Sequence, residues 1–271
     1  MLTRPPSGRA HQGPLRVAVL CSQRAPGLMH LLNSSPDRGA AFEIVCCVTS
    51  EGTFAEGARV ERRGIPTLSH PITDFCEARG TSIYRDIAVR QEYDRGTLAL
   101  IEPFLPDLVL LDGYLYLVTA VLLRRFPNRI LNLHFSDLTL RTIQGAPRFP
   151  GLRAVRDALA AGCRETRATV HLVNEVPDGG APIVRSWPFP VSPLVEELRT
   201  MGADDVFKAY GFAHQEWMMR TASGPLVSAA LRLIAAGAID LDTLASGGAH
   251  AETPWVLDRQ GCLTAAALEF A

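Results

Sequence analysis

Short apolar runs alternate with segments of helical spacing along the first half of the chain. Runs typical of buried parallel strands lie at residues 15–21, 42–48, 65–68, 106–111 and 129–134. Helical spacing or helix-boundary residues mark the intervening segments 26–32, 56–63, 84–104 and 119–126. Strands and helices that alternate in this way predict an α/β fold, with a Rossmann-like, mostly parallel sheet flanked by helices.

The pattern changes after residue 134, toward longer loops and antiparallel pairing. Residues 136–151 are rich in Thr, Gly and Pro and predict a loop, which a helix follows at residues 154–161. Two strand-like runs, 169–173 and 182–188, are expected to pair antiparallel around the turn-forming residues 176–180.

Helical spacing dominates the rest of the chain up to residue 239. Residues 195–201 and 204–236 predict helices, the second of them interrupted near Gly211 and at Gly224-Pro225. We expect a disordered tail over residues 1–13, one catalytic domain over 14–239, and a short C-terminal extension over 240–271 that contains a hairpin.

Composition narrows the class of protein. The chain has 271 residues, of which 47% are hydrophobic and 20% charged, with a net charge of −1. These values are typical of a soluble enzyme, and near-neutral charge argues against nucleic-acid binding. We expect no membrane association, since no apolar stretch approaches the ~20 residues of a membrane helix. The start of the chain lacks the apolar region of a secretory signal. Six cysteines without C-x-x-C spacing indicate reduced thiols in a cytoplasmic protein rather than disulfides or zinc.

Three polar side chains are the main candidates for chemistry. Asn132 and His134 end the fifth apolar run, and their alternation places both side chains on the same face of a strand. Asp178 follows 44 residues after His134, in a turn beyond the next strand-like run. Sites in open α/β sheets gather at the carboxyl ends of strands, so the three groups are expected to converge. An amide, an imidazole and a carboxylate suit transfer of a one-carbon acyl unit to an amine.

Five segments in order carry a resemblance to a known family: residues 106–114, 129–134, 149–151, 169–171 and 178–180. The chain resembles the folate-dependent formyltransferases, such as glycinamide ribonucleotide formyltransferase and, more distantly, methionyl-tRNA formyltransferase. The similarity runs from about residue 15 to 239. It implies a formyltransferase fold, 10-formyltetrahydrofolate as co-substrate, and Asn132, His134 and Asp178 as the catalytic residues.

The resemblance also implies a folate slot built from two segments of the chain. The first follows the fourth strand and the second precedes the catalytic Asp. Their residues are Tyr114, Leu115, Tyr116, Leu117 and Val118, and Val173, Asn174, Glu175, Val176 and Pro177.

The acceptor half departs from the family pattern. The Gly-rich loop S-G-x-G-S-N that holds the substrate phosphate in glycinamide ribonucleotide enzymes is replaced here by residues 22–27, without the family glycines and with Pro26. Phe135 stands in place of the family proline and Tyr116 in place of an arginine. Further departures are an insertion between residues 136 and 149 and the stretch 191–195, where the family is acidic. Candidate substrate-binding residues are Ser22, Arg24, Ser136, Arg141 and Arg148.

The sequence thus predicts formyl transfer from 10-formyltetrahydrofolate to a small-molecule amine other than glycinamide ribonucleotide. Hydroxymethyl transfer, hydrolysis of formyltetrahydrofolate, and a non-catalytic folate-binding regulatory protein are the alternatives, and a homodimer is left open. His171 is interpreted as a structural histidine that is satisfied within a strand.

Overall fold

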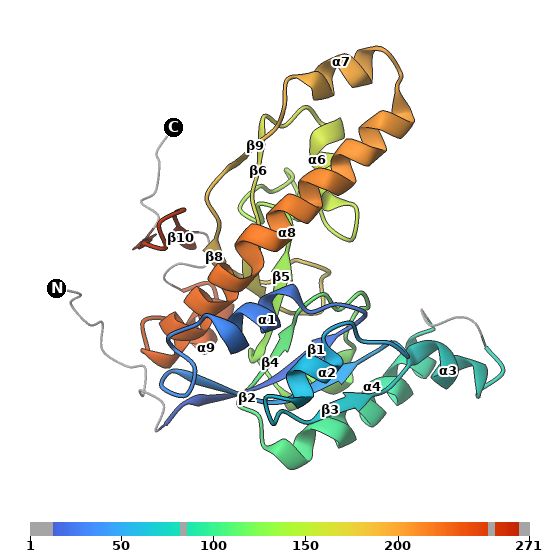
Figure 1. Cartoon of the computed structure of the whole chain (residues 1–271), viewed down its shortest axis with the longest axis vertical. Coiled ribbons are helices and arrows are strands. Elements are labelled where there is room, and N and C mark those ends of the chain that lie inside the picture. Colours follow the sequence, from blue (N-terminus) through green and yellow to red (C-terminus); the bar gives the residue numbers. More distant parts are fainter. Residues whose placement is uncertain (1–12, 82–85, 249–252, 266–271) are drawn as a thin grey trace.

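One twisted sheet organises the computed structural model, which describes residues 13–81, 86–248 and 253–265 (Figure 1). In this part of the chain the sheet has nine strands in the order β11-β10-β8-β7-β5-β4-β1-β2-β3. The strands are β1 (Leu15–Cys21), β2 (Phe42–Thr49), β3 (Thr67–Ser69), β4 (Leu108–Leu111), β5 (Ile130–His134), β7 (Thr169–Leu172), β8 (Pro182–Arg185), β10 (Trp255–Leu257) and β11 (Leu263–Ala265). The first five pair in parallel, while β7 runs antiparallel to both of its neighbours, β5 and β8. The predicted fold class is confirmed.

Helices cover both faces of this sheet. They are α1 (Pro26–Asn33), α2 (Gly57–Glu61), α3 (Ile72–Glu77), α4 (Ile87–Ile101), α5 (Ala120–Arg125), α6 (Ala154–Ala160), α7 (Leu194–Thr200), α8 (Asp204–Ala235) and α9 (Leu241–Ala245), with a 3-10 turn η1 (Glu102–Phe104). Alternation along β1 sends Val17 and Val19 into the core beneath α1 and α8, and Ala18 and Leu20 into the core on the opposite face. A strand that is buried on both faces explains the continuous apolar run seen in the sequence.

The long helix α8 is unbroken, so the predicted interruptions near Gly211 and at Gly224-Pro225 are wrong (Figure 1). Pro225 lacks the backbone N–H that would complete a helical hydrogen bond. The helix continues past this position because the turns around Pro225 are buried and packed against the core. Gly224 allows α8 to pack closely against α1, since a Cβ at this position would lie 2.2 Å from the Cβ of His30. The glycine therefore marks close approach of two helices rather than a break.

The C-terminal extension adds to the sheet edge. β10 pairs in parallel with β8, and β11 returns antiparallel to β10 as a hairpin. Two short helices, α3 and α9, and a small separate pairing of β6 (Glu165–Thr166) with β9 (Phe189–Pro190) were not anticipated. Most of the predicted N-terminal tail, residues 1–12, lies outside the described residues. No helix in the described ranges is long and apolar enough to cross a membrane.

Candidate active site

Asn132 and His134 lie at the carboxyl end of β5, in the middle of the sheet. β5 is paired on one side with β4 and on the other with β7, so the backbone beneath both side chains is fixed. His134 is 9% exposed. Such a position satisfies the requirement that catalytic groups be held on rigid elements.

The partner of Asn132 is His171, which faces it across the β5–β7 pairing. His171 Nδ1 lies 2.6 Å from the carbonyl oxygen of Leu172. A carbonyl only accepts, so Nδ1 carries the proton and Nε2 is left to accept. The amide nitrogen of Asn132 donates to this Nε2 over 3.1 Å. The hydrogen bond fixes the orientation of the Asn132 amide and leaves its second N–H available at the end of the strand.

His134, like His171, has one ring nitrogen hydrogen-bonded to a backbone carbonyl. Its Nε2 donates to the oxygen of Phe149 over 3.1 Å, and its Nδ1 faces Asp178 Oδ1 at 3.6 Å. One imidazole nitrogen is thus committed to the long loop after β5, while the other points to the carboxylate. Protonation of this imidazole would create an ion pair with Asp178.

Asp178 joins the two histidines. Its Oδ1 lies 3.6 Å from His134 Nδ1 and 3.7 Å from His171 Nε2, and its Oδ2 accepts from the amide of Gly151 over 2.7 Å. The distances to the imidazoles exceed a direct hydrogen bond, and in free enzymes such contacts commonly tighten when substrate binds. The structure therefore brings together Asn132, His134 and Asp178, as the sequence predicts.

The backbone around Asp178 explains the Asp-Gly-Gly motif. Asp178 itself has a left-handed φ of 54°, a conformation that Asp adopts more readily than most residues. A Cβ on Gly180 would lie 1.9 Å from the carbonyl oxygen of Leu172. Glycine is required there so that the turn can pass directly over the end of β7.

His171 is kept neutral by its surroundings. Burial, supported by the nearby imidazole of His134, lowers the pKa of His171 to about 4, and the carboxylate of Asp178 opposes this shift only in part. A neutral imidazole at physiological pH keeps the lone pair that Asn132 requires. The sequence interpretation of His171 as a structural residue missed this role. Strand register was the available signal, since β7 pairs with β5 at the predicted catalytic residues.

The first predicted folate segment, residues 114–118, lies in the connection between the carboxyl end of β4 and α5. Leu115 and Leu117 are 48% and 65% exposed, whereas Tyr116 is half-buried and donates from its hydroxyl to Glu51 Oε1 over 2.7 Å. The buried Arg90 of α4 donates to the backbone carbonyl of Leu117 and so anchors this segment. An exposed leucine surface on a fixed backbone suits one face of a flat ring.

The second predicted folate segment, residues 173–177, leads from β7 into the Asp178 turn. Val173 packs on the same apolar cluster as Tyr114 and Val118 of the first segment. Val176 is 54% exposed, and Asn174 and Glu175 are also exposed. The two segments therefore share one apolar base, and each follows the carboxyl end of a sheet strand.

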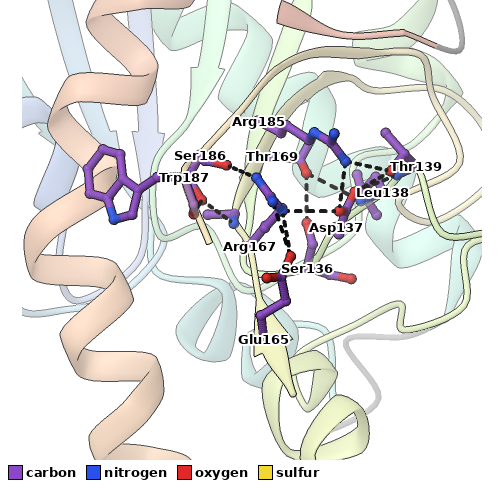
Figure 2. Close-up of polar contacts among 11 residues, drawn as sticks. Ser136, Asp137, Leu138, Thr139, Glu165, Arg167, Thr169, Arg185, Ser186 and Trp187 are labelled. Carbon is purple, nitrogen blue, oxygen red and sulfur yellow. Dashed lines mark hydrogen bonds and ion pairs between the residues drawn. The ribbon is translucent and has the colours of Figure 1, made fainter. Parts of the chain in front are cut away.

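A polar network fixes the start of the loop after β5 (Figure 2). Asp137 accepts from Arg185 over 3.1 Å and lies 3.7 Å from the guanidinium of Arg167, while Thr169 donates to the carbonyl of Ser136 over 2.7 Å. The hydroxyl of Ser136 is buried and has no hydrogen-bond partner among the described residues. Ser136 therefore retains a polar group two residues beyond His134.

The other predicted substrate residues divide into two groups. Arg141 lies close enough to His171 to depress the pKa of that imidazole, and Arg148 stacks on Phe149, whose carbonyl holds His134. Ser22 and Arg24 are engaged elsewhere. The Ser22 hydroxyl is buried against Ser50, and Arg24 forms a two-pronged ion pair with Glu216.

Comparison with known proteins identifies the architecture. Residues 15–203 match the family model described as formyl transferase. A chicken trifunctional purine biosynthetic protein adenosine-3 is 28% identical over 86% of this chain, which spans a fifth (20%) of that relative's length. A formyltetrahydrofolate deformylase of Escherichia coli O6:H1 is 29% identical, covering 73% of this chain and 60% of the relative.

A solved structure agrees in fold. Glycinamide ribonucleotide transformylase 1 from Symbiobacterium toebii superposes with a TM-score of 0.55 at 26% identity, over 79% of this chain and 89% of that one. The chain therefore belongs to the formyl transferase family, an enzyme family whose formyl donor is 10-formyltetrahydrofolate.

Proposed function

We propose that the protein transfers a formyl group from 10-formyltetrahydrofolate to the amine of a small molecule. The observation that carries this proposal is the convergence of Asn132, His134 and Asp178 at the carboxyl end of β5, with His171 holding the Asn132 amide. In this proposal, segments 114–118 and 173–177, which pack on one apolar cluster, form the folate slot.

The residues divide the work of acyl transfer. Attack by the amine nitrogen makes the formyl oxygen negative, and the second N–H of Asn132 donates to it, as in an oxyanion hole. His134, whose Nδ1 lies 3.6 Å from Asp178 Oδ1, adds positive charge beside this oxygen when it carries the proton taken from the amine. Collapse breaks the bond between the formyl carbon and the folate nitrogen. The proton lost by the amine then reaches that nitrogen through His134.

Hydrolysis is the second candidate, because a formyltetrahydrofolate deformylase is 29% identical to this chain. Water would replace the amine at the same carbon, and formate would be released. The catalytic residues are the same in both reactions, so the acceptor decides between them.

One assay separates the candidates. The protein is incubated with 10-formyltetrahydrofolate, with and without a panel of primary amines, and both tetrahydrofolate and formate are measured. Amine-dependent production of tetrahydrofolate without formate supports transfer, whereas formate in the absence of amine supports hydrolysis. A chain that neither binds nor consumes the donor contradicts the proposed function.

A further inference from the structure

The start of α1 offers no free backbone donor to an anion. A helix N-terminus ordinarily presents free backbone N–H groups that attract phosphate. At the start of α1 these groups are all committed: the amide of Ala25 donates to Glu56 over 3.4 Å, and Pro26 has no N–H. The amides of Gly27 and Leu28 donate to Asp112 over 3.2 Å and 2.7 Å.

The carboxylate of Asp112 occupies the N-terminus of α1, where a bound phosphate would otherwise accept these hydrogen bonds. The residue follows directly after β4, is fully buried, and places one carboxylate oxygen on each of the two amides. Gly27 makes room for it, since a Cβ at Gly27 would lie 3.2 Å from both oxygens. Burial raises the pKa of Asp112, and the two backbone hydrogen bonds limit the rise to a value of about 6. The carboxylate is therefore mainly ionised at neutral pH.

The nearby cation is also neutralised. Both terminal nitrogens of Arg24 bind the carboxylate of Glu216 on α8, at 3.2 Å and 3.1 Å. Three carboxylates, those of Glu56, Asp112 and Glu216, thus occupy the donors that a phosphate would need. The negative charge that they bring repels a second anion.

This loop borders the catalytic residues. Leu111, which precedes Asp112, is paired with Asn132 on β5 and with Leu20 on β1. Neighbouring strands lie about 5 Å apart, so the start of α1 is within reach of the far end of a small acceptor bound at Asn132. We propose that Asp112 excludes phosphate from the acceptor site, so that the acceptor of this enzyme is an amine without a phosphate group. This inference rests on the proposed function.

Calorimetric titration of the full chain with ribose 5-phosphate tests the role of Asp112. We expect no measurable binding to the wild type and binding at least about tenfold tighter to Asp112→Ala, which opens the two amides of α1. Asp242→Ala is the matched control, because it removes an equal charge from an exposed carboxylate paired with Arg129. This control should bind no better than the wild type.

Three outcomes would overturn the inference. The wild type could bind ribose 5-phosphate as tightly as Asp112→Ala does, or Asp112→Ala could show no binding. The affinity of Asp242→Ala could also rise as much as that of Asp112→Ala. Asp112→Ser replaces Asp112→Ala if thermal melting shows that the alanine variant is unfolded. If neither variant folds, the wild-type titration decides, since micromolar binding contradicts exclusion and absence of binding supports it. The titration contains no folate, so failure of the proposed function would be seen separately, in donor binding and turnover.

Discussion

The Nε2 atom of His171 lies 3.1 Å from the amide nitrogen of Asn132, on the neighbouring strand of the sheet. The lone pair at this atom accepts one N–H of the amide and so fixes the orientation of the other. Asn132 is therefore proposed to donate to the transition state, and His171 to act as its positioning residue.

Replacement of His171 by Phe should lower kcat by about tenfold to a hundredfold, less than the ~10²–10³ that loss of a whole oxyanion donor costs. KM for the formyl donor should stay unchanged, because the polar partners of His171 are Asn132, Leu172 and Asp178, outside both proposed folate segments. His171→Gln, whose side-chain oxygen can accept from Asn132, should recover part of the activity. Steady-state kinetics of both variants measure this, and equal loss in Phe and Gln would indicate a packing role instead.

The low pKa of His171 predicts how stability depends on pH. Burial lowers the pKa to about 4, whereas the histidine of the unfolded chain titrates near 6.5. Between these values the unfolded chain binds a proton that the folded chain does not, so the free energy of unfolding should fall as the pH falls through this window. Urea unfolding at a series of pH values should show this slope, and His171→Gln should flatten it. An unchanged slope in the variant would assign the effect to another group.

Two glycines in the same helix should respond in opposite directions to alanine. Gly224→Ala would place a Cβ 2.2 Å from His30 and should destabilise the fold by about 1–3 kcal/mol. At Gly211 the nearest atoms lie 3.8 Å away, so Gly211→Ala should be neutral or stabilise by up to about 1 kcal/mol. Thermal melting of the pair tests whether contact with α1 accounts for the glycine. Similar melting temperatures would argue that it does not.

The proposed folate slot depends on an exposed apolar surface. Leu117 is 65% exposed beside the catalytic end of the sheet, and Leu117→Asp should weaken binding of 5-formyltetrahydrofolate by about tenfold or more, because it places a charge where the slot should meet a flat ring. Val206→Asp is a fitting control, since Val206 is 54% exposed in the first turn of α8. Calorimetry of both variants checks the slot. Equal affinities would locate the folate elsewhere.

Much of the fold was predictable because its strands are buried on both faces and its helices separate them regularly. Asn132 and His134 could be placed together because two residues in one strand share a face. The distance of 3.6 Å between His134 and Asp178 depends also on the register of β5 with β7, which no local pattern specifies. The same register hid His171, whose alternation fits an ordinary strand.

The features that the sequence predicted wrongly also depend on tertiary contacts. Gly224 and Pro225 favour a helix break locally, yet contact with α1 and burial of the surrounding turns override that preference. The unusual residues 22–27 could be recognised in the sequence as a loop without the family glycines. The position of Asp112 at the start of α1 could not be recognised, since Asp112 follows β4 and lies 85 residues after Gly27 in the chain.

The central claim is that His134 and Asp178 act with Asn132 in formyl transfer, and consumption of 10-formyltetrahydrofolate by wild type, His134→Ala and Asp178→Ala tests it most directly. With an accepted amine present, each variant should lose about 10²–10⁴-fold in turnover. Each should retain wild-type affinity for 5-formyltetrahydrofolate and a cooperative melting transition. Near-wild-type turnover in either variant would contradict the account.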